Sequence, residues 1–177
     1  HIMSYEEFKN TKIFMKYTPM DIEDMINFMK ARDDLYVAVD SKISPAEIYT
    51  ALVKTARDMN AEEILTRIIV SLYSTKDVEA VRSIYPNFRH YVLRQYGWSH
   101  NWYELAEFCV KNNVPVVNVF NFVIDDDPEG IKILTDKGIT VYAAVVNSLK
   151  QMQKYKDMGI TGAVSDYLSE SDWELLK

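Results

Sequence analysis

The most informative segment for the fold is Leu35-Tyr36-Val37-Ala38-Val39-Asp40-Ser41-Lys42. Its five apolar or aromatic residues run without a polar break, which is typical of a strand buried in a parallel sheet. The two-residue period of a strand then places the carboxylate of Asp40 and the ammonium of Lys42 on the same face. Because the carboxyl ends of parallel strands carry the chemistry of α/β folds, the stretch indicates a metal or phosphate site, or else a structural ion pair.

Strand and helix patterns alternate along the rest of the chain. We expect strands over 35–42, 64–73, 89–94, 114–120, 140–146 and 162–166. We expect helices over 18–31, 44–59, 76–84, 102–112, 128–137, 149–158 and 170–176, after a short helix within 4–17. Thr18-Pro19 and Ser44-Pro45 are expected helix starts, and Gly138 and Gly159 are expected helix stops. Because helices of about ten residues separate the strands, the pattern predicts right-handed βαβ units and a parallel sheet.

Length and composition indicate one globular domain. The chain has 177 residues, 48% hydrophobic and 26% charged, enough to bury one core. We assign residues 4–177 to that domain and His1-Ile2-Met3 to a vector-derived remnant. The net charge of −6 argues against nucleic acid or an anionic membrane surface as partner, because both need clustered positive charge. No stretch is long enough for a membrane span, and Cys109, the single cysteine, is expected to be a buried apolar side chain.

About six βα units are compatible with two architectures. An open doubly wound sheet accommodates six strands, whereas a closed (β/α)8 barrel needs eight. No strand is followed by a Gly-x-Gly-x-x-Gly or Walker-type loop, so a nucleotide site of the Rossmann kind has no support. The chain is therefore either an unusual open sheet or most of a barrel.

Several short motifs favour the barrel by their order and spacing. They are Ser4 to Phe8, Lys16 to Pro19, Asp40-Ser41-Lys42, Ile84-Tyr85-Pro86, Gly138-Ile139 with Val141-Tyr142 and Asn147, and Gly159 to Gly162 with Ser165-Asp166. Together they resemble the C-terminal three quarters of the glycerophosphodiester phosphodiesterases, a metal-dependent (β/α)8-barrel family. The resemblance covers nearly the whole chain. It implies an incomplete TIM-type barrel of about six parallel strands that lacks the first two family strands.

The resemblance also implies roles for the two charged residues at the first strand end. Asp40 would ligate a divalent metal, Mg²⁺ or Ca²⁺, and Lys42 would neutralise the phosphate of a small-molecule glycerol phosphodiester. These roles are chemically sound, because hard cations prefer carboxylate oxygens and a phosphodiester needs positive charge around its non-bridging oxygens. The family's catalytic histidines and its two other metal-binding acids have no matching motif here. His90 and His100 lie in segments that do not match those histidines.

Other strand ends depart from the family pattern. Ala144-Val145-Val146 precede Asn147, where relatives usually carry an aromatic residue or histidine and then threonine. Ser71 stands where close relatives often have glutamine. These changes indicate that the mouth of the barrel, formed by the C-terminal ends of its strands, is remodelled. Four residues are candidates for lining it: Ser71, Trp98, Asn147 and Asp166.

Three of the remaining features have competing interpretations. Trp98, in an aromatic loop over 96–102, either stacks on a sugar or organic head group or plugs the core. Asp166 either orients a loop or caps the last helix. Asp125-Asp126-Asp127 is an N-cap and first-turn acid cluster rather than a calcium loop, because no Gly or Glu lies at the required offsets.

Two functions are compatible with the sequence. The first is the C-terminal part of a metal-dependent phosphodiesterase that hydrolyses a glycerol phosphodiester to glycerol phosphate and an alcohol, inactive as this chain. The second is a catalytically inactive binding or assembly module of a cell-envelope or polymer-synthesis protein. We expect a soluble domain, alone or within a larger membrane- or envelope-associated protein. Exposed strand edges also predict self-association, or coverage of a gap by residues 4–17.

Overall fold

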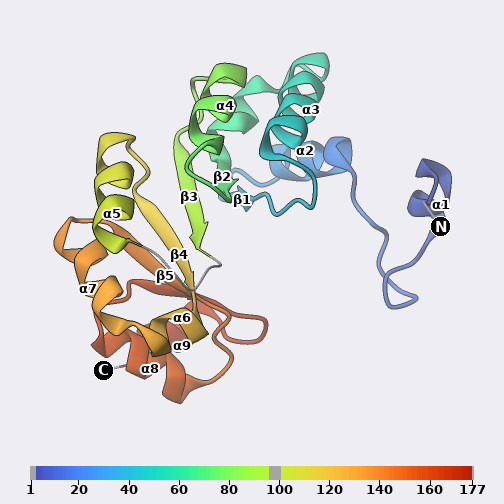
Figure 1. Ribbon diagram of the computed structural model, residues 1–177. Coiled ribbons are helices and arrows are strands. Elements are labelled where there is room, and N and C mark those ends of the chain that lie inside the picture. Colours follow the sequence, from blue (N-terminus) through green and yellow to red (C-terminus); the bar gives the residue numbers. More distant parts are fainter. Residues whose placement is uncertain (1–2, 96–100, 177) are drawn as a thin grey trace.

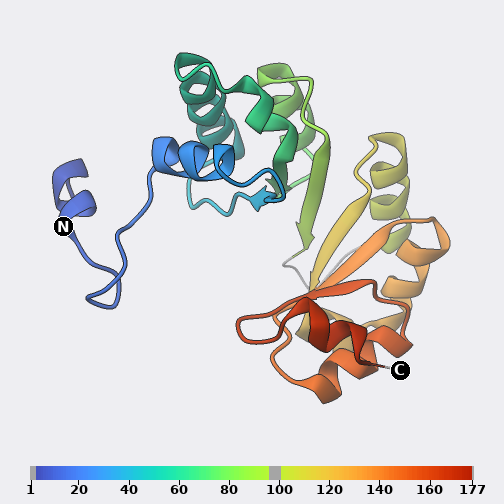
Figure 2. The same ribbon diagram turned by 180° about the vertical axis from the view of Figure 1, so that it is seen from behind.

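The computed structural model describes residues 3–95 and 101–176 and contains one parallel sheet (Figure 1). Six strands follow in sequence order across the sheet, and every neighbouring pair is parallel. The sheet curls into a half-barrel with helices on its convex side (Figures 1 and 2). A closed barrel of this type has eight strands, so the chain forms an incomplete α/β barrel, as the sequence predicts.

The strands are short and lie close to their expected positions. They are β1 (Val37–Ala38), β2 (Ile68–Leu72), β3 (His90–Gln95), β4 (Val116–Phe120), β5 (Thr140–Ala144) and β6 (Gly162–Val164). The helices are α1 (Tyr5–Asn10), α2 (Ile22–Lys30), α3 (Pro45–Asp58), a 3-10 helix η1 (Glu62–Arg67), α4 (Asp77–Ile84), α5 (Trp102–Lys111), α6 (Asn121–Asp126), α7 (Pro128–Asp136), α8 (Leu149–Asp157) and α9 (Glu170–Glu174). In the part of the chain that the structure describes, no helix combines the length and apolar content that a bilayer crossing requires.

Local capping explains most helix boundaries. Ser44 accepts a hydrogen bond from the backbone N–H of Glu47, and the Glu47 carboxylate accepts one from the N–H of Ser44, so α3 begins where the sequence predicts. Gly138 and Gly159 follow α7 and α8 with φ of 75° and 85°. Because glycine adopts this left-handed conformation without steric cost, both helices stop there, as expected.

Four local predictions were wrong in detail. Helix α2 begins at Ile22 rather than after Thr18, because Asp21 and Asp24 form the capping box. Strand β1 spans only two residues, because only Val37 and Ala38 pair with β2. Residues 62–67 form the 3-10 helix η1 instead of extending the second strand. Helix α6, at the end of β4, was not anticipated.

The acidic run before α7 divides between two helices. Asp125 and Asp126 end α6, and only Asp127 caps α7, where it accepts the N–H of Gly130. The Asp125 carboxylate instead accepts hydrogen bonds from Lys154 and the hydroxyl of Tyr155 on α8. The prediction of one N-cap cluster was therefore right only for Asp127.

The core lies between the convex face of the sheet and the helices. Val70 on β2, Val117 on β4 and Val141 on β5 are fully buried in it. Cys109 on α5 joins this core, and burial raises the pKa of its thiol to about 11. The predicted structural role of this cysteine is confirmed.

The concave face of the sheet is open. Tyr36, Tyr142 and Val164 remain 52%, 37% and 43% exposed, and a hollow of about 300 Å³ runs across this face. In a closed barrel, such inward-pointing side chains fill the interior in layers. Arg94, Asn118 and Tyr142 are register neighbours on β3, β4 and β5 and line this hollow. The C-terminal end of this face is the mouth at which the candidate site lies.

Candidate functional site

Asp40 and Tyr73 lie together at the mouth, at the ends of β1 and β2. Asp40 follows β1, and its Oδ1 accepts a hydrogen bond of 2.5 Å from the hydroxyl of Tyr73, which follows β2. The same hydroxyl accepts the backbone N–H of Ser41 at 3.2 Å. Tyr73 therefore fixes both the carboxylate and the backbone of the Asp40-Ser41-Lys42 motif.

A helix start holds Tyr73 in turn. The carboxylate of Asp77, the first residue of α4, accepts the backbone N–H groups of Tyr73 and Ser74 at 2.9 and 2.7 Å. Burial, and then the hydrogen bond to Asp40, raises the pKa of Tyr73 to about 12. The phenol consequently stays protonated at neutral pH and remains a donor to Asp40.

Two cations lie near this carboxylate. The Nε of Arg94, near the end of β3, donates to the Oγ of Ser71 at 3.2 Å. Lys42 is exposed and forms no ion pair with Asp40 in the described part of the chain. The hydrogen bond from Tyr73, aided by the charges of Arg94 and Lys42, holds the pKa of Asp40 below its usual value. The simple strand-end ion pair of Asp40 with Lys42 is thus not what the structure contains.

Asn147 and Asp166 form a second polar cluster, at the ends of β5 and β6. The Nδ2 of Asn147 donates to the Asp166 carboxylate at 2.9 Å, and its Oδ1 accepts the Asp166 backbone N–H at 2.9 Å and the Ser165 hydroxyl at 3.1 Å. Asp166 therefore orients the loop after β6. The last helix is capped by Ser169 and Asp172 instead.

The predicted site residues that the structure describes fall into these two clusters. Ser71 lies with Asp40 through Arg94, whereas Asn147 lies with Asp166. Trp98 and His100 lie outside the described residues. His90 is the first residue of β3, at the end of the strand away from the mouth, where its ring packs edge-on against Tyr36.

Sequence reasoning missed Tyr73 and Arg94 as site residues. Both stand at the ends of expected strands, so their positions were a usable signal. Their contacts were not, because a tyrosine at a strand end points to either face depending on how the chain turns into the next helix.

The described residues do not fit a divalent metal by themselves. Residues 3–95 and 101–176 contain no group of three or more His, Cys, Asp and Glu side chains placed to hold an ion. The groups around Asp40 are a phenol donor and two cations, whereas Mg²⁺ and Ca²⁺ are bound by several oxygen ligands. This chemistry suits an anion better than a cation.

Comparison with solved structures relates the fold to known proteins. A glycerophosphodiester phosphodiesterase from Parabacteroides distasonis superimposes with a TM-score of 0.72 at 15% identity, over 98% of this chain and 70% of that one. An Oleispira antarctica phosphodiesterase, in complex with the product sn-glycerol-3-phosphate, gives 0.62 at 13% identity, over 82% and 56%. KGPDC from Streptococcus mutans gives 0.58 at 11% identity, over 86% and 73%.

These comparisons establish the fold alone. No protein-family model and no curated protein sequence matches the chain. The half-barrel has the fold of the glycerophosphodiester phosphodiesterases, so the resemblance read from the motifs is confirmed at the level of the fold. The chain spans only about two thirds or less of several of these structures, for example 54% of a Silicibacter pomeroyi neighbour.

Proposed function

We propose that this chain is the phosphate-binding later part of a barrel of the glycerophosphodiester phosphodiesterase type. Its mouth would take the phosphate of a glycerol phosphodiester or of sn-glycerol 3-phosphate. The observation that carries the proposal is the arrangement at the ends of β1 to β3, where Tyr73 fixes Asp40 and the charges of Arg94 and Lys42 act on its carboxylate. The fold likeness supports it, because one neighbour holds sn-glycerol-3-phosphate.

Each residue has a distinct part in this proposal. Lys42, on an exposed loop, meets a non-bridging phosphate oxygen as a mobile point charge. Arg94 is half-buried and tethered to Ser71, so it offers its remaining guanidinium N–H donors in a fixed direction. Asp40 would supply one carboxylate oxygen ligand if a divalent ion joined the phosphate, as the resemblance implies.

We do not expect hydrolysis by this 177-residue chain. No three His, Cys, Asp or Glu side chains of the described residues are grouped so that they could hold a divalent ion, and no histidine of this part of the chain lies at the mouth. Metal-assisted catalysis and proton transfer each contribute several orders of magnitude to such reactions. The purified chain should therefore bind the phosphate ester without turning it over.

Two measurements test this proposal. Phosphorus NMR of glycerophosphocholine with the chain, in Mg²⁺ or Ca²⁺, should show no hydrolysis above the buffer rate. Calorimetric titration with sn-glycerol 3-phosphate should show binding that weakens about ten-fold in Arg94→Gln or Lys42→Gln, equivalent to about 1.4 kcal/mol. Lys30→Gln, on the exposed end of α2, is the matched control and should bind as the unmodified chain does.

The opposite results would have clear meanings. Metal-dependent turnover that disappears in Asp40→Ala would make the chain a complete enzyme. The proposal of phosphate binding would be contradicted if the heat of titration equalled the heat of dilution. Circular dichroism should show in that case that the protein has the expected helices and strands.

One observation favours a second candidate, a non-catalytic binding or assembly module of a cell-envelope or polymer-synthesis protein. Where the family resemblance leads us to expect polar side chains at the end of β5, Ala144 and Val146 are apolar and buried in this chain. An assay of glycerophosphodiester hydrolysis separates the two candidates when the chain is tested together with a polypeptide that supplies the strands missing from the half-barrel. The first predicts hydrolysis in that assembly, and the module predicts none.

A further inference from the structure

The chain between α1 and α2 forms an exposed apolar turn, which we define as residues 12–17. Phe14 and Met15 at its tip are 86% and 94% exposed, and Ile13 and Tyr17 beside them are about half exposed. Soluble proteins rarely present several large apolar side chains together at full exposure unless the patch meets a partner. Figures 1 and 2 show this segment projecting away from the half-barrel.

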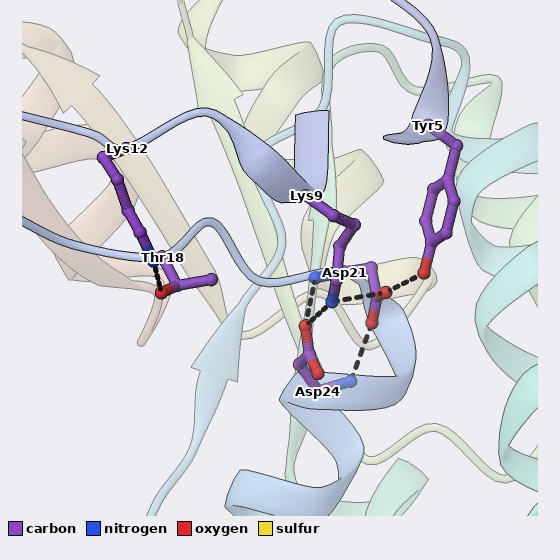
Figure 3. A network of polar contacts seen from close by, with 6 residues as sticks. All are labelled: Tyr5, Lys9, Lys12, Thr18, Asp21 and Asp24. Carbon is purple, nitrogen blue, oxygen red and sulfur yellow. Dashed lines mark hydrogen bonds and ion pairs between the residues drawn. The ribbon is translucent and has the colours of Figure 1, made fainter. Parts of the chain in front are cut away.

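Backbone pairing preforms the turn. Ile13 and Tyr17 exchange two backbone hydrogen bonds of 2.8 and 2.9 Å, which close the loop at its base. The Nζ of Lys12 donates to the hydroxyl of Thr18 at 2.7 Å (Figure 3). Phe14 and Met15 adopt φ of 50° and 57°, a left-handed conformation that is uncommon for such side chains. The backbone conformation thus presents both apolar side chains to the outside.

Polar contacts then fix the base of the turn to the body. The Nζ of Lys9 on α1 forms ion pairs with Asp21 and Asp24 at the start of α2, and the hydroxyl of Tyr5 donates to Asp21 at 2.6 Å (Figure 3). These contacts hold α1, which precedes the turn, against the start of α2, which follows it.

The charge of this segment is opposite to that of the whole chain. Residues 10–20 contain Lys12 and Lys16 and no carboxylate, although the chain as a whole carries −6. The two carboxylates nearest to the segment in the sequence are hydrogen-bonded, Glu7 to the backbone of Ser4 and Asp21 to Lys9. Charges separated by more than about 8–10 Å are largely screened at physiological salt, so the local lysines set the field at the tip.

We propose that the apolar turn inserts into the surface of an anionic lipid bilayer. Phe14 and Met15 would enter the boundary between headgroups and acyl chains, while Lys12 and Lys16 meet the lipid phosphates. The observations favour a bilayer over a protein groove for two reasons. The exposed tip projects from the half-barrel, so it can enter the headgroup region of a bilayer, and the lysines beside it complement anionic headgroups (Figures 1 and 2).

Vesicle co-sedimentation tests this proposal with the 177-residue chain. The chain should sediment with vesicles of phosphatidylcholine and phosphatidylglycerol in equal parts, and much less with phosphatidylcholine alone. Phe14→Asn combined with Met15→Asn should lower the partition coefficient about ten-fold or more, because the transfer free energy of two large apolar side chains is lost. Asparagine tolerates left-handed φ, so this pair keeps the turn and the fold.

Two further variants make the experiment specific. Lys16→Gln should weaken binding to the anionic vesicles about five-fold and reduce its salt dependence. Tyr103→Gln removes a comparable aromatic side chain, 63% exposed on α5, and should bind as the unmodified chain does.

Three outcomes would overturn the proposal. The first is no sedimentation of the unmodified chain with anionic vesicles, and the second is equal sedimentation of the asparagine pair. The third is self-association without lipid that the asparagine pair abolishes, because the turn would then dock on a second copy of the chain.

Discussion

Tyr73 is the residue that determines how Asp40 is presented at the mouth. It donates to the carboxylate and accepts from the backbone of Ser41, so it joins the ends of β1 and β2. Both contacts depend on one hydroxyl group. A single-atom change at Tyr73 therefore probes the site without altering the packing of the ring.

We expect Tyr73→Phe to raise the pKa of Asp40 toward its ordinary value of about 4, because the hydrogen bond from Tyr73 is the main cause of the lowered pKa. The sign follows from linkage. A depressed carboxyl pKa adds stability above the unfolded pKa, and this is lost as the pH falls through the folded pKa. Carbon-detected NMR titration of the carboxylate measures the shift, with Tyr103→Phe as control. An unchanged Asp40 titration in Tyr73→Phe would contradict the role assigned to Tyr73.

Gly130 on α7 has a packing role that its conformation alone does not reveal. A Cβ at this position would overlap the indole ring of Trp102, whose N–H donates to Asp127 at 2.7 Å. We expect Gly130→Ala to lower the free energy of unfolding by about 1–3 kcal/mol or more, as overpacked cores do. Urea unfolding measures this loss.

A smaller partner should relieve that clash. In a Trp102→Leu background, Gly130→Ala should cost clearly less, which a double-mutant cycle measures as coupling. Equal costs in the two backgrounds would show that the indole is not what excludes a side chain at this position.

At the scale of elements, α1 is held to the domain by polar contacts rather than by a core. None of its residues is buried, and its contacts with Asp21 and Asp24 at the start of α2 run through Tyr5 and Lys9. Short isolated helices are marginal in water, so its order depends on these contacts. A single substitution at one of these contacts should therefore be enough to detach α1 from α2.

Lys9→Met should release α1 from α2, since it removes both ion pairs while keeping the aliphatic stem. Hydrogen exchange over residues 5–10 should accelerate, with little change in the unfolding of the whole domain, because exposed ion pairs contribute modestly. Lys30→Met, at the exposed C-terminal end of α2, is the control and should leave this exchange unchanged. Exchange that stays slow in Lys9→Met would mean that α1 is ordered by other contacts.

The attachment should also depend on pH. The hydrogen bond from Tyr5, the backbone N–H of Asp24 and the ammonium of Lys9 together hold the pKa of Asp21 far below its usual value. The contribution of Asp21 is therefore complete above a pH of about 4 and declines as the pH falls further. Exchange over residues 5–10 should accelerate in that acid range.

At the scale of the whole molecule, the half-barrel leaves two strand edges without a neighbouring strand. In the described sheet β1 pairs only with β2, and β6 pairs only with β5. Unpaired edges are ready templates for another strand. The arm of residues 4–17 lies beside α2 rather than over the open concave face, so coverage of the gap by this segment is not what the structure contains (Figures 1 and 2).

Self-association through these edges stays a prediction. Size-exclusion chromatography with light scattering should show a molar mass that rises with concentration. Val164→Lys on β6 should suppress this rise, because a charged edge resists pairing. Val110→Lys, at an exposed position on α5, is the matched control. A monomer at every concentration would remove the prediction.

Local sequence patterns were sufficient to predict the alternating strands and helices of this protein. Buried strand runs, proline and serine at helix starts and glycine at helix ends are local signals, and they indicated parallel βα units with boundaries close to those observed for α3, α5, α7 and α8. The position of the Asp40 carboxylate at the end of the first strand was also predictable, because side chains alternate along a strand whatever its distant contacts are.

The surroundings of that carboxylate and the surfaces that stay open depend instead on contacts between distant parts of the chain. The partners of Asp40 are Tyr73, 33 residues away, and the charge of Arg94, and no local pattern predicts which side chains neighbouring strands bring together. The short β1 and the exposed turn at Phe14 and Met15 have the same origin. Strand length and exposure depend on which neighbours a segment finds in space, whereas helix starts and stops depend on hydrogen bonds within a few residues.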